Sequence, residues 1–158
     1  WAPGKTIHSR VFHIRQSFIV FTTALRTHIT TVARILHSEL RAAMLEANSI
    51  DAMVGVYAAH RKRLETALLL SANLSPVREA MVSGLVLCEQ FGPMWDALMN
   101  EELDSDSHLR ADRALRRLQK ELQSTVSFLA AGVRNVSRVG GETLLEVLAE
   151  QLEAIVAR

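Results

Sequence analysis

The side chains of this sequence that could carry chemistry begin with six histidines. They stand far apart, at His8, His13, His28, His37, His60 and His108. None has the H-E-x-x-H or Glu-x-x-His spacing with which a helix brings zinc or di-iron ligands onto one face. We interpret the histidines as surface residues or as residues with a partner inside the fold. The sequence predicts no metal and no other cofactor.

The chain has a single cysteine, Cys88, which lies between Leu85 and Phe91 on an apolar face. This setting predicts a buried structural thiol rather than a nucleophile. One cysteine also excludes an internal disulfide and a multi-cysteine zinc site. Four carboxylates lie close together, at Glu101, Glu102, Asp104 and Asp106. They could be taken for a calcium-binding loop, but they lack the glycine and the final glutamate of an EF-hand loop. We therefore do not interpret them as a calcium site.

The sequence contains neither a glycine-rich phosphate loop nor a recognisable Ser/His/Asp arrangement. We therefore predict that the chain is not an enzyme. Residues 1–63 hold nine basic and three acidic residues, whereas residues 64–158 hold nine and fourteen. The net charge of the whole chain is +1, so composition gives no sign of nucleic-acid binding.

The basic residues fall into two sets that could contact an acidic protein surface. The first set lies on the predicted first helix and consists of Arg10, Arg15 and Arg26. The second set has helical spacing later in the chain: Arg110, Arg113, Arg117 and Lys120. Each set is either an ordinary solvated face or a docking face, and the sequence leaves both interpretations open.

These residues must be positioned by one folded domain. The 158 residues are 49% hydrophobic, which is enough for a core, and seven Gly with three Pro argue against a β-fold with many tight turns. We predict a single helical domain over residues 1–158. Because it starts at Trp1 rather than at Met, we expect it to be a piece of a longer chain. No apolar run approaches 18 residues, so membrane insertion is not expected.

Apolar residues recur every three or four positions and predict an all-α fold. We expect an elongated antiparallel bundle of about five helices with one long first helix, over about residues 10–46. A second helix follows the break at Asn48-Ser49 and runs to about Ser71, and a third ends at Gly92-Pro93, with a further turn or two over residues 94–99. A loop is predicted at about 100–108, then a helix over about 109–137, a break at Gly140-Gly141 and a last helix. The predicted buried stripe of the first helix is Ile14, Phe18, Phe21, Leu25, Ile29, Val32, Leu36 and Leu40, and that of the third is Val77, Met81, Leu85, Cys88 and Phe91.

Several spacings occur in an order that resembles a known family. The first helix reads Arg15-x-x-Phe18-x-x-Phe21-x-x-x-Leu25-x-x-His28. The second begins with Asp51 and carries Tyr57-Ala58-Ala59-His60, and the third carries Leu87-Cys88-x-x-Phe91. Over about residues 11–155 this order resembles the γ-tubulin complex component family of spindle-pole-body and γ-tubulin ring proteins. His28 stands where that family usually has Tyr, and Tyr57 and His60 are exchanged, so the resemblance is to a divergent member.

The resemblance implies a non-catalytic interaction module from the carboxy-terminal half of such a component, which holds γ-tubulin and supports microtubule nucleation. The implied partners are γ-tubulin and other γ-tubulin complex components, with no nucleic acid. The implied location is the cytoplasm and cytoskeleton, at a microtubule-organising centre or spindle pole. The alternative is a helical sensor bundle, unrelated to microtubules, that binds a small apolar ligand or a metal. Convergent polar residues around a cavity, or metal in the purified protein, would favour that alternative.

Overall fold

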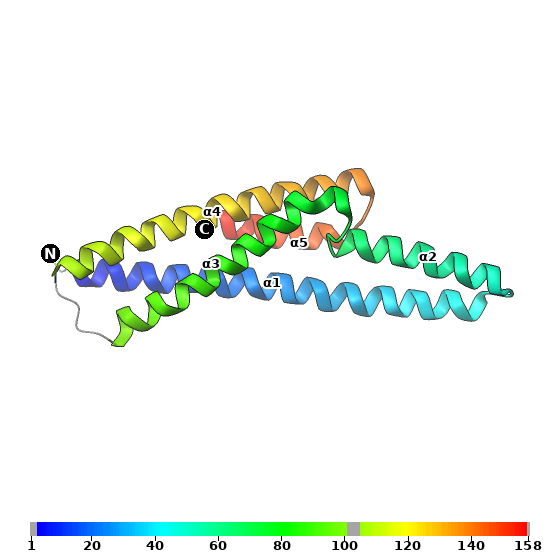
Figure 1. Ribbon diagram of the computed structural model, residues 1–158, viewed down its shortest axis with the longest axis horizontal. Coiled ribbons are helices and arrows are strands. Elements are labelled where there is room, and N and C mark those ends of the chain that lie inside the picture. Colours follow the sequence, from blue (N-terminus) through cyan, green and yellow to red (C-terminus); the bar gives the residue numbers. More distant parts are fainter. Residues whose placement is uncertain (1–2, 101–104, 158) are drawn as a thin grey trace.

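The protein is an all-α bundle, as the apolar spacing predicts. The computed structural model describes residues 3–100 and 105–157, and the side chains within 7–99 and 106–157. In these ranges there are five α-helices, one 3-10 turn and no strand (Figure 1). The elements are α1 (Pro3–Glu46), α2 (Ile50–Ala67), η1 (Ala72–Leu74), α3 (Ser75–Asn100), α4 (Ser105–Gly140) and α5 (Leu144–Val156).

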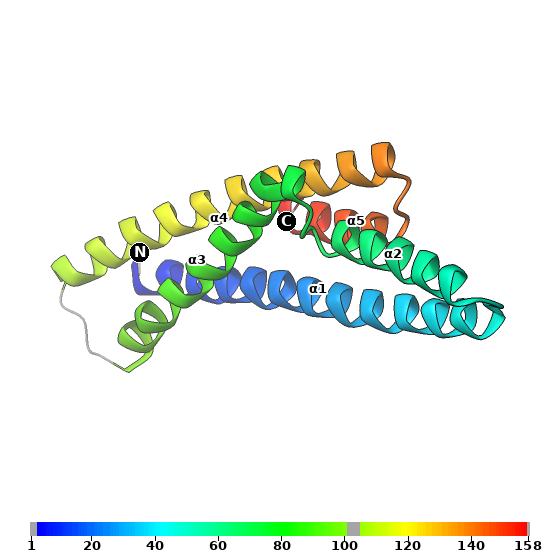
Figure 2. The ribbon, with the colours of Figure 1, turned by 45° about the vertical axis from the view of Figure 1, so that its right-hand side comes forward.

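Helix α1 runs along the whole molecule and belongs to two different packings. Its first half packs with α3, α4 and α5, and we call this part the bundle. Its second half packs with α2, and these two helices form a hairpin that stands clear of the bundle (Figure 2). We call this hairpin the arm. Helix α1 is long because its first half belongs to the bundle and its second half belongs to the arm.

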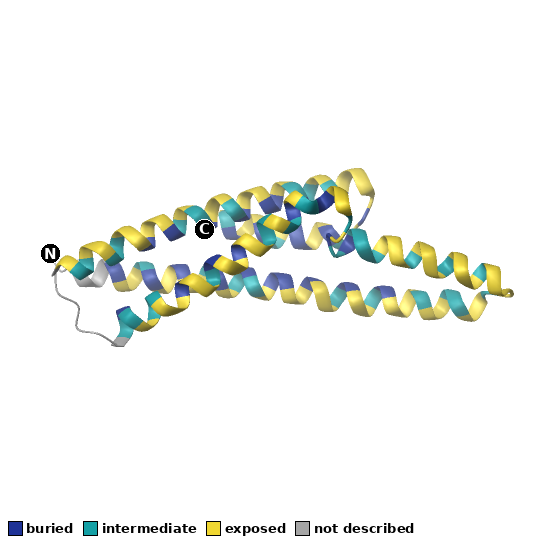
Figure 3. Ribbon diagram, in the orientation of Figure 1, coloured by how far each residue is buried: buried dark blue, intermediate teal, exposed yellow. Residues whose placement is uncertain are grey.

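The bundle has a continuous apolar core. The apolar spacing of the last two helices predicts a seam in each, and these seams are buried except at Val136, which is half-buried. They consist of Leu115, Leu118, Leu122, Val126, Leu129, Val133 and Val136 in α4, and of Leu145, Leu148, Leu152 and Ile155 in α5. Burial fades along the arm, whose outer end is exposed on most sides (Figure 3). A small separate cluster of Val32, Leu36 and Ala67 lies where the arm meets the bundle.

The predicted breaks between helices have the expected local chemistry. Ser49 is the N-cap of α2, and its hydroxyl accepts a hydrogen bond from the Ala52 amide at 3.1 Å. Gly141 follows the end of α4 with φ of +64°, a left-handed conformation that glycine adopts without steric cost. Helix α2 ends at Ala67, earlier than the predicted Ser71.

The prediction that Gly92-Pro93 ends the third helix is wrong. Helix α3 passes through Pro93 and continues to Asn100, and it includes the predicted separate turn over residues 94–99. Proline removes one backbone hydrogen bond, but Pro93 is exposed whereas Leu98 is buried in the core. Burial of the last two turns therefore outweighs the local cost of the proline.

The loop predicted at residues 100–108 is shorter in the structure. Asn100 ends α3, and Ser105 to His108 already form the first turn of α4. Residues 101–104, which hold three of the four clustered carboxylates, lie outside the described residues. The first helix also begins earlier than predicted, at Pro3 instead of about Arg10.

In the predicted buried stripes of the first and third helices, two residues are exposed. Ile29 is 50% exposed because it lies on α1 near the point where the packing partners change from the bundle to the arm. Leu85 is 42% exposed because its neighbours Gly84 and Leu87 take the inward positions of α3. No helix in the described part of the chain is both long and apolar enough to span a bilayer.

Candidate protein-docking site

Helix α3 lies across α1 and α4 and leaves an open groove along each of its flanks. Helix α3 exposes Val82, Leu85 and Val86, of which Val82 and Val86 line the groove beside α4. Contiguous exposed apolar surface of this kind is typical of sites that contact other proteins. The two grooves differ in their lining, and the difference decides which is the stronger candidate.

The groove between α1 and α3, which we call the aromatic groove, has a volume of about 350 Å³. Trp95 on α3 contacts Phe12 on α1 edge to face, with ring centroids 5.2 Å apart. Phe91 links this pair to Phe18, because its ring lies 6.1 Å from Trp95 and 5.3 Å from Phe18. Phe12 is 51% exposed, so the aromatic cluster reaches from the core to the surface.

Arg15 is held at the edge of the aromatic groove. Its guanidinium carbon lies 5.1 Å from the centroid of the Trp95 ring, which is a cation–π contact. Arg15 is exposed and forms no ion pair with any residue that the structure describes. Arg26 lies farther along the same face of α1, since positions 15, 19, 22 and 26 share one side of a helix. Arg26 is also exposed, and it forms no ion pair with a residue that the structure describes.

The other predicted contact residues have different surroundings. Arg10 forms an ion pair with Asp112 of α4, and Arg117 pairs with Glu121 at 2.8 Å. The rest of the second set is exposed on α4: Arg110, Arg113 and Lys120. The first set is thus split, because Arg10 ties α1 to α4 whereas Arg15 and Arg26 are available to a partner.

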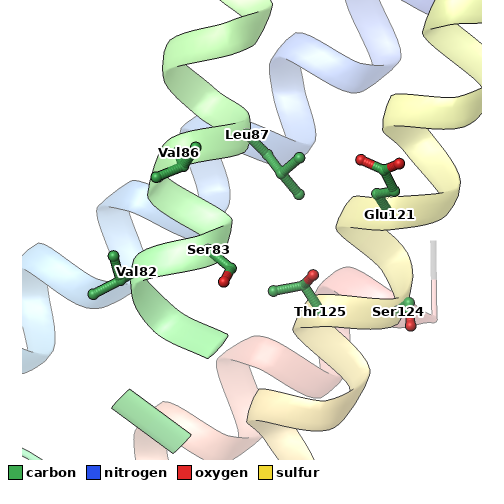
Figure 4. Close-up of a pocket in the computed structure, with 7 residues that line it drawn as sticks. All are labelled: Val82, Ser83, Val86, Leu87, Glu121, Ser124 and Thr125. Carbon is green, nitrogen blue, oxygen red and sulfur yellow. The ribbon is translucent and has the colours of Figure 1, made fainter. Parts of the chain in front are cut away.

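The groove between α3 and α4 is shown in Figure 4 and measures about 390 Å³. Val82, Val86 and Leu87 give its α3 side an apolar surface. The α4 side supplies the hydroxyls of Ser124 and Thr125 together with the Glu121 carboxylate, which is already engaged by Arg117. This groove suits an apolar side chain but offers no available cation or aromatic ring among its lining residues.

The residues that carry the family resemblance occupy two regions. Phe18, Phe21, Leu25 and Phe91 are buried in the bundle, and Cys88 is half-buried beside the aromatic groove. The remaining positions lie on the arm: Asp51 and Tyr57 are exposed and His60 is half-buried. Phe18 and Phe91 are in ring contact, so the patterns of the first and third helices meet in space.

His28 joins the two helices of the arm. Its Nε2–H donates to the carbonyl oxygen of Ala67, the last residue of α2, at 2.8 Å. Burial lowers the pKa of His28, opposed by the Ala67 hydrogen bond and by the nearby Glu142 carboxylate. This histidine is therefore a buried side chain with a partner inside the fold.

Two further groups bear on possible chemistry. Burial raises the pKa of the Cys88 thiol to about 11, so the thiol is protonated at neutral pH and is a poor nucleophile. Across the described residues, no three His, Cys, Asp or Glu side chains gather in a way that could hold a metal ion.

The sequence did not reveal the role of Phe12 and Trp95. Trp95 lies beyond the predicted end of the third helix, so the sequence pattern does not connect it with Arg15. The only available signal was the spacing of Phe12, Arg15 and Ile19, which places them on neighbouring parts of one helical surface.

Comparison with protein-family models gives no match, and neither the curated proteins nor the solved structures include a significant match to this chain.

Proposed function

We propose that this chain is a non-catalytic docking module of a γ-tubulin complex and that γ-tubulin binds at the aromatic groove. The family assignment rests on the ordered residue pattern of the first three helices. The placement of the contact rests on one observation: Arg15 lies over Trp95 without a carboxylate partner, next to the exposed Phe12. Other γ-tubulin complex components are the further partners, and a microtubule-organising centre or spindle pole is the location.

The composition of the groove supports binding to a protein surface. Tryptophan, arginine and other aromatic residues are enriched among the residues that dominate binding energy at interfaces. Trp95 and Phe12 supply apolar area, while Arg15 and Arg26 supply positive charge for the acidic surface that tubulins commonly present. Stacking on Trp95 also restrains Arg15, which reduces the conformational entropy lost on binding.

The second basic set is the weaker candidate for the contact. The exposed apolar neighbour of Arg110, Arg113 and Lys120 on α4 is Leu109. The aromatic groove instead sets the exposed Arg15 beside aromatic rings, although the Asp96 carboxylate also lines it and Arg26 lies farther along α1, outside its lining. Exposed charges by themselves contribute little affinity, because water and salt screen them. A cation beside a desolvated aromatic surface contributes more.

The test is to mix the purified chain with γ-tubulin and to measure the mass of the complex by size-exclusion chromatography with light scattering. We expect a one-to-one complex at about 50 mM salt that weakens at about 300 mM salt, since the Debye length shortens as salt rises. The variant Arg15→Glu/Arg26→Glu is expected to lose the complex. If these residues are dominant contacts, the loss in binding free energy is about 2 kcal/mol or more.

The matched control reverses two exposed cations on α4, in the variant Arg110→Glu/Arg113→Glu. It makes the same change in net charge but leaves the groove intact, so binding should fall only slightly. Loss of binding in the α4 variant alone would move the contact to α4. Absence of a complex with the unaltered chain, shown to be folded by circular dichroism, would contradict the proposed function.

A further inference from the structure

One side of helix α3 carries two exposed apolar side chains between two carboxylates. Glu79, Val82, Val86 and Glu89 follow one another at steps of three, four and three residues, so they lie along one face of the helix. Val82 is 50% exposed and Val86 is 43% exposed, and both glutamates are exposed. We call this row the α3 stripe. At 1.5 Å per residue, its two ends are about 15 Å apart.

The α3 stripe borders the groove between α3 and α4. Val82 and Val86 belong to the lining of this groove, and Leu87 and Thr125 point into the space between the two helices (Figure 4). Phe128 follows Thr125 by three residues on the same side of α4, and its side chain is 54% exposed. The groove therefore has exposed apolar side chains on both helices, as sites that contact other proteins commonly do.

The carboxylates of the α3 stripe are not neutralised by the described part of the chain. Neither Glu79 nor Glu89 forms an ion pair with a residue that the structure describes. Glu79 accepts a hydrogen bond from the Ser75 hydroxyl at 2.7 Å, which leaves its negative charge in place. Arg78, the basic residue of α3, donates instead to the carbonyl oxygen of Leu70 at 3.2 Å. Both ends of the stripe thus keep an available negative charge.

The positions of these charges decide what can cover the stripe. A second copy that packed by the same stripe would place carboxylate against carboxylate in a parallel and in an antiparallel arrangement, because Glu79 and Glu89 lie at equal distances from its middle. Like charges that face each other across an interface disfavour that pairing. A helix with an apolar face and a basic residue at each end of that face matches both the charges and the apolar middle.

We infer that the groove between α3 and α4 binds an amphipathic helix of another protein, whose apolar face is flanked by Lys or Arg at both ends. Its apolar side chains pack on Val82 and Val86 and reach Leu87, and its two cations pair with Glu79 and Glu89. The inference is independent of the proposed function, because the aromatic groove lies on the other flank of α3, beside α1.

The probe is a synthetic alanine-rich peptide of about 17 residues with capped ends, long enough to form a helix. In it Lys, Leu, Leu and Lys follow one another at the steps of the α3 stripe. Fluorescence anisotropy of the labelled peptide should show one-to-one binding to the whole chain, with a Kd of roughly 10–100 µM at about 50 mM salt. A second peptide with Glu in place of both Lys should bind about tenfold more weakly, because it repels the stripe. Circular dichroism checks that the two peptides are equally helical.

Charge reversal in the protein should reverse this preference. The variant Glu79→Lys/Glu89→Lys should bind the Glu peptide about tenfold more tightly than the Lys peptide. The matched control is Glu146→Lys/Glu150→Lys, which reverses two exposed carboxylates on α5 and should keep the original preference.

Removal of the apolar middle should weaken both peptides. Val82→Ser/Val86→Ser loses the apolar contact without changing the charge, and both residues are exposed, so the core is not disturbed. The control is Val147→Ser on α5, at a residue that is 59% exposed, and it should bind both peptides like the unaltered chain. Circular dichroism checks the fold of every variant.

Three results would overturn the inference: no saturable binding of the Lys peptide up to roughly 1 mM, equal affinities for the two peptides, or equal effects of charge reversal on α3 and on α5. A dimer of the unaltered chain that Glu79→Lys/Glu89→Lys abolishes would also overturn it, because the groove would then belong to a second copy. The result is separate from γ-tubulin binding. Glu79→Lys/Glu89→Lys should still bind γ-tubulin if the proposed function holds, and Arg15→Glu/Arg26→Glu should still bind the Lys peptide.

Discussion

Arg63 of α2 donates from Nε to Oε2 of Glu142 at 3.0 Å, which ties the arm to the segment between α4 and α5. Glu142 is only 6% exposed, and its other oxygen accepts a hydrogen bond from the Leu144 amide at 3.3 Å. Arg63 also pairs with Glu39 of α1. Together with the His28–Ala67 hydrogen bond, these contacts form the junction that sets the direction of the arm relative to the bundle.

Removing Arg63 should destabilise the junction. In Arg63→Ala the buried Glu142 carboxylate loses its cation, and we expect the free energy of unfolding to fall by about 1–2 kcal/mol, less than for a fully buried pair because Arg63 is itself 41% exposed. Urea unfolding followed by circular dichroism measures the change. The matched control is Arg61→Ala, which removes an exposed ion pair with Glu65 on the same helix and should leave the midpoint unchanged. Equal shifts in the two variants would argue against a special role for the junction.

His28 should make the stability depend on pH. Its pKa is lowered in the folded chain, chiefly by burial, from a reference value of 6.5. The unfolded chain therefore binds a proton more readily, and stability should be full above pH 6.5 and decrease as the pH falls below it. Thermal unfolding at a series of pH values should show this decrease.

The variant His28→Gln keeps a side-chain donor for the Ala67 carbonyl but does not titrate. Its stability should vary less between pH 7.5 and pH 5.5 than that of the unaltered chain. His37→Gln, at an exposed histidine of the same helix, is the control and should keep the original profile. An unchanged profile in His28→Gln would show that other groups cause the pH dependence.

Gly84 should not tolerate a side chain. A Cβ at this position would lie 2.6 Å from Cζ and 2.8 Å from Cε1 of Phe21, a residue that is completely buried. Gly84→Ala is therefore expected to lower the free energy of unfolding by about 1–3 kcal/mol, in spite of the better helix propensity of alanine.

The control for Gly84 is Gly55→Ala on α2, where the added Cβ meets open space. That change should raise the free energy of unfolding by about 0.5–1 kcal/mol. Chemical unfolding of both variants provides the comparison. A gain in stability for Gly84→Ala would show that α3 lies farther from Phe21 than the structure indicates.

Cys88 should react slowly with thiol reagents. With a pKa of about 11, the thiolate fraction at pH 8 is on the order of one in a thousand, whereas an ordinary thiol with a pKa near 9 has roughly one in ten. Alkylation followed by mass spectrometry at pH 8 should be about a hundredfold slower in the folded chain than in urea. Equal rates in the two states would mean that Cys88 is not protected by the fold.

The helices of this protein could be predicted because their apolar spacing is strong. The seams of α4 and α5 are buried as predicted except at the half-buried Val136, and the breaks at Ser49 and Gly141 follow from capping and from a left-handed glycine. The predictions that fail concern residues whose environment is set from a distance. Pro93 was predicted to end a helix, but α3 continues through it because later residues are buried in the core. Ile29 fits the apolar stripe of the first helix, but it is exposed because the packing partner of α1 changes near it.

The candidate site was only partly visible in the sequence. The sequence indicates Arg15 and Arg26 as candidate contact residues on the first helix. It gives equal weight to Arg10 on the same helix and to the basic set on α4. Their different roles depend on partners that are far away in the chain: Asp112 neutralises Arg10, and Trp95 supports Arg15. No local pattern encodes these pairings.

The sequence by itself determined the all-α class, the long first helix and the helix breaks at Asn48-Ser49 and Gly140-Gly141. These follow from local physics, because periodic burial and capping act within a few turns. Only the tertiary structure decided that α1 is shared between a bundle and an arm, that α3 places Trp95 beside Arg15, and that Arg63 reaches Glu142. The reason is that these contacts depend on how whole helices cross, and helix crossing is set by the fit of many side chains together.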